Sequence, residues 1–78
     1  MPFSAVIVLD ERTNQRKIID SLEEAAEFIL YDWPVVPGDT IVAARQACLA
    51  ALLGKIDPQV ARDAFVEAAR QARILIEA

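Results

Sequence analysis

The most reactive side chain in the sequence is that of Cys48, which lies in the apolar run Ala47–Ala51. A catalytic thiol needs a neighbouring base or cation that favours its thiolate form. The 78-residue chain contains no histidine and only this one cysteine. We therefore expect Cys48 to be a buried, inert core residue. The same composition argues against zinc and most other transition-metal sites, and we expect no cofactor.

Three carboxylates, Glu23, Glu24 and Glu27, are close together on a predicted helix. A Mg²⁺ or Ca²⁺ site needs several converging oxygen ligands, and the sequence has no EF-hand loop pattern, so an acidic, solvated helix face is the better interpretation. Gly38 and Gly54 fit turn or cap positions and form no phosphate-binding loop. Because no catalytic motif is present, the sequence predicts a protein that is not an enzyme.

Three arginines, Arg62, Arg70 and Arg73, form the main basic cluster of the chain. They give the alternative hypothesis, a small nucleic-acid-binding regulator that uses the last helix. The formal net charge is −4, whereas affinity for nucleic acids comes largely from lysine and arginine. Interspersed acids in that helix also favour an ordinary charge-mixed face. We therefore expect no nucleic-acid partner, and an anionic membrane surface is disfavoured for the same reason.

Two apolar features indicate a protein-binding surface instead. Trp33 precedes Pro34, and tryptophan in a stiff loop is a common hot-spot residue, although the apolar stripe of the preceding helix runs into it and favours a core position. The second feature is an arc of the central helix on which apolar residues stand beside polar ones. The candidate interface is Trp33 with Val42, Arg45, Gln46, Leu49 and Leu53. The sequence leaves open whether this arc is covered within the chain, and whether its partner is a second copy in a homodimer or another protein.

The elements that would position these residues follow from periodicity and turn signals. The runs Phe3–Leu9 and Arg16–Asp20 predict two strands joined by a loop of about five residues, a hairpin whose edges are open to pairing. Ser21 and Glu24 fit a capping box, in which Glu24 reaches back to the N–H of Ser21, at the start of a helix that should end near Asp32. A proline-rich loop, 33–39, follows that helix.

The remaining chain predicts two further helices. The stretch Ile41–Leu53 is so apolar that we expect a central helix buried on most of its circumference, capped by Asp39 or Thr40 and ended by Gly54. Asp57 and Pro58 then open the last helix. For residues 74–78 a continued helix and a short third strand are equally compatible. The fold class is thus α+β, one domain over residues 1–78 in the order ββααα, with or without a C-terminal extended segment.

The pattern resembles the domain of unknown function 982 family, found mostly in alphaproteobacteria. The residues that carry the resemblance are Ser21-Leu22-Glu23-Glu24-Ala25-Ala26, Trp33-Pro34, Ala47-Cys48-Leu49-Ala50-Ala51-Leu52-Leu53-Gly54 and Ala61-Arg62-Asp63-Ala64-Phe65-Val66-Glu67-Ala68-Ala69. The family often has a glycine after its last helix, where this sequence has Arg73. The resemblance implies a small, soluble bacterial protein and supplies no activity.

The sequence also predicts where the protein works. A single cysteine cannot form an internal disulfide, and small secreted domains are usually rich in disulfides. The N-terminus lacks the features of a signal peptide, and no apolar run reaches the length of a membrane span. We expect a cytoplasmic, non-catalytic interaction or regulatory module.

Overall fold

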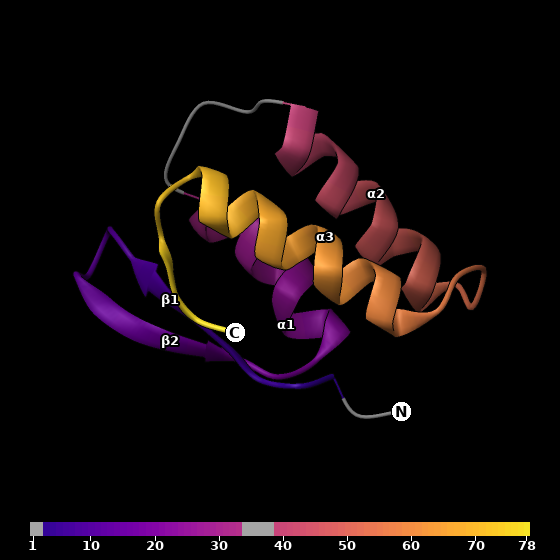
Figure 1. The fold of residues 1–78 in the computed structure, drawn as a ribbon, viewed down its shortest axis with the longest axis horizontal. Coiled ribbons are helices and arrows are strands. Elements are labelled where there is room, and N and C mark those ends of the chain that lie inside the picture. Colours follow the sequence, from indigo (N-terminus) through magenta and orange to yellow (C-terminus); the bar gives the residue numbers. More distant parts are fainter. Residues whose placement is uncertain (1–2, 34–38) are drawn as a thin grey trace.

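The computed structural model describes residues 3–33 and 39–78, apart from the side chains of Asp32 and Asp39. A small antiparallel sheet lies against one side of a layer of helices (Figure 1). The elements are β1 (Val6–Asp10), β2 (Gln15–Ile19), α1 (Leu22–Glu27), η1 (Phe28–Asp32), α2 (Asp39–Leu52), α3 (Pro58–Gln71) and β3 (Leu75–Glu77). The α+β class is confirmed. No described helix is long and apolar enough to cross a membrane.

The C-terminal segment is extended, so the expectation of a hairpin followed only by helices is incomplete. The described part of the sheet has the strand order β2-β1-β3, with both neighbours antiparallel to β1. β3 therefore covers the edge of β1 that the sequence left open. A register shift between Ile7 and Val8 marks a bulge in the β1–β3 pairing, which adds local twist to this short edge.

The hairpin is one residue tighter than predicted, because Asp10 pairs with Gln15 and leaves a four-residue turn at 11–14. The Asp10 carboxylate accepts a hydrogen bond from the backbone N–H of Arg12 at 3.0 Å. Asn14 has φ of 58°, a left-handed conformation that asparagine tolerates better than most residues. These features together reverse the chain between β1 and β2.

The first helix begins as predicted and ends differently. The Ser21 hydroxyl accepts from the N–H of Glu24 at 3.1 Å, so Ser21 is the N-cap. The Glu24 carboxylate accepts from the N–H of Asp20 at 3.1 Å, not from that of Ser21, which corrects the expected capping box by one residue. The predicted regular helix changes to a π-helix at Phe28 and reaches Asp32 in that form.

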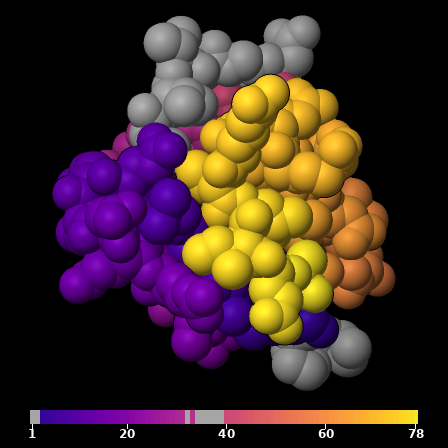
Figure 2. Space-filling view, turned by 60° about the vertical axis from the view of Figure 1, so that its left-hand side comes forward, coloured from indigo at the N-terminus to yellow at the C-terminus, as the bar shows by residue number. Residues whose placement is uncertain are grey.

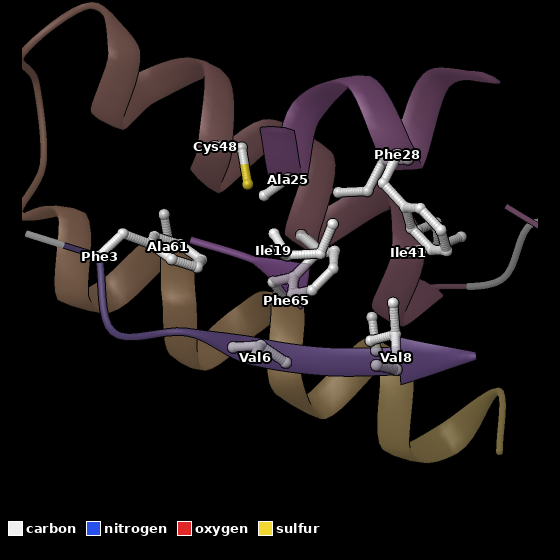
Figure 3. Packing of buried hydrophobic residues seen from close by; sticks show 14 of the residues in the cluster. Phe3, Val6, Val8, Ile19, Ala25, Phe28, Ile41, Cys48, Ala61 and Phe65 are labelled. Carbon is white, nitrogen blue, oxygen red and sulfur yellow. The ribbon is translucent and has the colours of Figure 1, made fainter. Parts of the chain in front are cut away.

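The core lies between the inner face of the sheet and the three α-helices (Figure 3). Val6 and Val8 of β1 and Ile19 of β2 are fully buried on the inner face. Phe28 and Phe65 are the largest buried side chains, and their rings meet edge to face with centroids 6.3 Å apart. Aromatic pairs in this geometry add stabilisation beyond the area that they bury.

α2 is buried along one side only, which corrects the expectation that other elements surround it. Ile41, Ala44, Cys48 and Ala51 are buried, and α2 packs against α1 and α3. Small side chains on this side allow the helix backbones to approach closely, and Figure 3 shows Cys48 pointing toward Ala25 of α1. The Thr40 hydroxyl adds a 3.2 Å hydrogen bond to the Gln71 amide oxygen of α3.

Both long helices end in the same hydrogen-bond pattern. After α2, the N–H of Gly54 donates to the carbonyl of Ala51, and that of Lys55 donates to Ala50. After α3, the N–H of Arg73 donates to Arg70, and that of Ile74 donates to Ala69. Both are Schellman motifs, which require a left-handed residue at the first position beyond the cap. Gly54, with φ of 78°, occupies that position after α2, and Arg73, with φ of 62°, occupies it after α3.

Candidate functional site

The predicted arc of α2 is exposed. The exposed fractions are 36% for Val42, 47% for Leu49 and 71% for Leu53. Arg45 and Gln46, between them on the same side, are exposed too. Since β3 and the hairpin both lie in the sheet, neither covers this arc. The question that the sequence left open, whether the arc is covered within the chain, is thus answered for the described residues.

Leu52 belongs to the same surface and was missed in the sequence analysis. It is 40% exposed. It follows Arg45 by seven residues, which places it about 20° from Arg45 around the helix. The helical spacing in the sequence was therefore enough to assign Leu52 to this surface. We call this surface the outer face of α2, and it consists of Val42, Arg45, Gln46, Leu49, Leu52 and Leu53.

Trp33, the other residue of the candidate interface, lies against the core. Its ring meets those of Phe28 and Phe65 edge to face, with centroid separations of 5.8 Å and 6.1 Å. It is partly buried and packs against the core cluster. This position agrees with the core alternative rather than with a fully presented hot spot. The loop that follows it, 34–38, lies outside the described residues, and so does the side chain of Asp39 as a helix cap.

Two of the three arginines of the nucleic-acid hypothesis have partners within the chain. The Arg62 guanidinium donates to the backbone carbonyl of Ser4 at 2.8 Å and so fastens the N-terminal segment to α3. The Arg70 guanidinium pairs with the Glu67 carboxylate. This pair and a hydrogen bond from Gln71 lower the pKa of Glu67 below its usual range. Arg73 occupies the cap position that ends α3.

Cys48 has the environment expected of an inert thiol. It is fully buried among the apolar core residues. Desolvation raises the pKa of its thiol from 9.0 to about 11, so the nucleophilic thiolate is disfavoured at neutral pH. Among the residues that the structure describes, no three histidine, cysteine or acidic side chains gather as ligands for a metal ion.

The comparisons with known proteins agree with this picture. A model of the family described as "Protein of unknown function (DUF982)" matches residues 4–76. The chain belongs to this family. Its fold is similar to the NMR structure of an Agrobacterium tumefaciens protein, with a TM-score of 0.77 and 28% sequence identity. That likeness covers 100% of this chain and 78% of the other, which was solved as a structural-genomics target. No curated protein matches the sequence.

The family match includes the outer face of α2, β1, β2 and all of β3 except its last residue, Glu77. The family description names no activity, so the comparisons leave the role of this DUF982 protein to be argued from its own surface. The outer face of α2 contains Leu53, the most exposed leucine, together with three further exposed apolar side chains, those of Val42, Leu49 and Leu52.

Proposed function

We propose that this DUF982 protein is a non-catalytic, cytoplasmic interaction module that binds an amphipathic helix of a partner protein on the outer face of α2. The observation that supports this function is the exposure of Val42, Leu49, Leu52 and Leu53 along one side of α2. The buried residues of α2 lie on the opposite side of the helix. Contiguous exposed apolar patches are uncommon on monomeric proteins and often mark interaction sites.

The shape of the surface favours a helical partner. The apolar residues follow one helix over about three turns, from Val42 to Leu53, and form a strip rather than a pocket. A partner helix with apolar residues at spacings of three and four would place one side chain against each leucine. Helices pack in this way at separations of about 8–10 Å.

The charge on the strip favours a different protein over a second copy. Arg45 is the only charged residue of the outer face of α2. If two copies paired through this face, each Arg45 would meet apolar residues, Gln46 or another arginine, and no carboxylate of the same face. A partner helix with an aspartate or glutamate opposite Arg45 would satisfy it.

Affinity capture with matched baits tests the proposal. The wild-type protein and Leu49→Glu are used as baits, and captured proteins are compared by mass spectrometry. A carboxylate in the middle of the strip should abolish capture of the specific partner, because it replaces a leucine contact, faces the apolar side chains of the partner helix and competes with the partner's carboxylate for Arg45. Asp63→Lys, on the charged outer side of α3, is the control and should capture the same partner as the wild type.

Circular dichroism must show that all three baits are folded, which we expect because Leu49 and Asp63 are both exposed. A further variant, Arg45→Glu, should weaken capture if the partner presents a carboxylate. If wild type and Leu49→Glu capture the same proteins in the same amounts, the outer face of α2 is not the binding surface and the proposal fails.

A further inference from the structure

The outer face of the sheet is a second apolar surface, separate from α2. Val6 and Val8 point into the core, so Ile7 and Leu9 lie on the opposite side of β1 by strand alternation, although Leu9 is partly buried and also packs against the core cluster. Ile18 of β2 is paired with Ile7, shares its side and is 58% exposed. On β3, Ile76 is 41% exposed. Figure 2 shows the hairpin and the C-terminal segment side by side on one face of the molecule.

Two opposite charges lie at opposite corners of this surface. Arg16 of β2 is paired with Leu9, and Glu77 of β3 is paired with Ile7. The two positions are therefore two residues apart along the strands and two strands apart across the sheet. These offsets are about 7 Å and 10 Å, so the two Cα atoms are about 12 Å apart.

The two side chains do not pair across that separation in the structure. Both side chains are exposed, and neither forms an ion pair or hydrogen bond with another side chain in the described ranges 3–33 and 39–78. The sheet face thus has an apolar centre and two unmatched charges of opposite sign. A surface of this kind is complementary to itself after a two-fold rotation.

We infer that a second copy of the chain docks on the outer face of the sheet, with Arg16 of each copy paired to Glu77 of the other. A two-fold axis in the plane of the sheet, diagonal to the strands and passing between Ile7 and Leu9, exchanges the two charged corners. The strands of the two sheets then cross at a steep angle, in the orthogonal class of sheet packing. The same rotation carries Ile18 of one copy toward Ile7 of the other.

A second copy fits this face better than an unrelated partner does. The charges are unmatched within the chain and matched between two copies, and a symmetric dimer uses each pair twice. The patch is built from a few residues of three short strands, far fewer than the roughly 20–30 residues a side of a standard interface, so the dimer should be weak and visible only at high micromolar concentration. Sheet-to-sheet docking leaves the outer face of α2 free in both copies, which keeps this inference separate from the proposed function.

Sedimentation velocity on charge-reversal variants tests the dimer. The wild type should shift from monomer to dimer as its concentration rises. Arg16→Glu and Glu77→Arg should each weaken the dimer at least about tenfold, because each places like charges together at two positions. The double variant Arg16→Glu/Glu77→Arg restores opposite charges and should recover a dissociation constant close to that of the wild type.

Matched controls place the same charge changes elsewhere. Lys55→Glu lies in the turn between α2 and α3, and Glu27→Arg lies on α1, and both residues are exposed. Both control variants should dimerise as the wild type does, and so should Leu49→Glu. The inference is overturned if the wild type is strictly monomeric at high micromolar concentration, or if the single reversals dimerise normally. It also fails if the double reversal stays as weak as the single ones, or if Leu49→Glu abolishes the dimer.

Discussion

α2 and α3 have the same length, 14 residues each, and pack against each other, yet their outer faces are different. The outer face of α3 is mostly charged, with Val60 as an exposed apolar residue, and its polar side chains bond to one another: Gln59 donates to Asp63 at 2.9 Å, and Arg70 pairs with Glu67. The outer face of α2 carries four exposed apolar residues and one arginine.

The difference shows which part of each helix serves the fold. Both helices bury a side of small residues, and α3 adds Phe65 at the centre of the core. That buried side is sufficient for the packing of α3, whose outer face is polar except for Val60, which is 53% exposed. We therefore expect that folding does not require the apolar residues on the outside of α2, and the binding role that we propose is the reason we give for them.

The largest expected effect is on the free energy of unfolding, when a core residue of α3 is truncated and compared with a truncation on the outer face of α2. Phe65→Ala should lower the free energy of unfolding by about 3–5 kcal/mol, because it leaves a cavity at the centre of the core. Leu53→Ala should change it by no more than about 0.5 kcal/mol, because that side chain is mostly exposed. Urea unfolding followed by circular dichroism measures both. Comparable losses in the two variants would show that the outer face of α2 supports the fold.

A second prediction concerns the buried side of α2. Burial raises the pKa of the Cys48 thiol from 9.0 to about 11, so the folded state favours the neutral thiol. Its contribution to stability is complete below pH 9 and is lost as the pH rises to about 11, a change of about 2–3 kcal/mol. The free energy of unfolding of the wild type, measured against pH and compared with that of Cys48→Ala, isolates this effect. Parallel curves for the two proteins would contradict it.

A third prediction compares the ends of the two helices, where Gly54 and Arg73 occupy equivalent left-handed positions. Gly54→Ala meets no atom within 4 Å, so its cost is the backbone strain alone, about 1 kcal/mol. Arg73→Gly should act in the opposite direction and stabilise the protein by about 0.5–1 kcal/mol, because glycine adopts this conformation without strain. Thermal unfolding should show a lower midpoint for the first variant and a higher one for the second. Shifts of the same sign would refute the equivalence of the two caps.

The smallest effect is expected on the outer face of α3. Arg70→Ala removes the exposed ion pair with Glu67, and such pairs contribute little because solvent screens them. The thermal midpoint should stay near that of the wild type, and adding salt should reduce the difference further. A loss as large as that of Phe65→Ala would mean that the outer face of α3 is as important to folding as its core side.

Local rules predicted most of the elements from the sequence. Ser21, Gly54 and Asp57 act as caps through hydrogen bonds within a few residues, so their roles can be read without the tertiary structure. The Asp57 carboxylate, for example, accepts from the N–H of Gln59 at 2.8 Å. The alternation of side chains along the two strands of the hairpin, and the burial of Cys48 within an apolar run, can likewise be predicted from short stretches of sequence.

The third strand could not be decided in this way. β3 pairs with β1, almost 70 positions earlier in the chain, so its formation depends on a contact that no local pattern records. A glycine in the left-handed cap position would have indicated where α3 ends and β3 can begin. This chain has Arg73 in that left-handed conformation instead. Non-local packing also decides the side on which α2 is buried, since apolar residues occur on both sides of it.

The most direct test of the binding role of α2 is site-specific photo-crosslinking in the native cell. A photoreactive amino acid is placed at position 49, on the outer face of α2, or at position 63, on the outer face of α3. The account predicts a discrete adduct with another protein from position 49, which disappears when Leu53→Glu is added, and no such adduct from position 63. Absence of an adduct from position 49, or equal adducts from both positions, would contradict it.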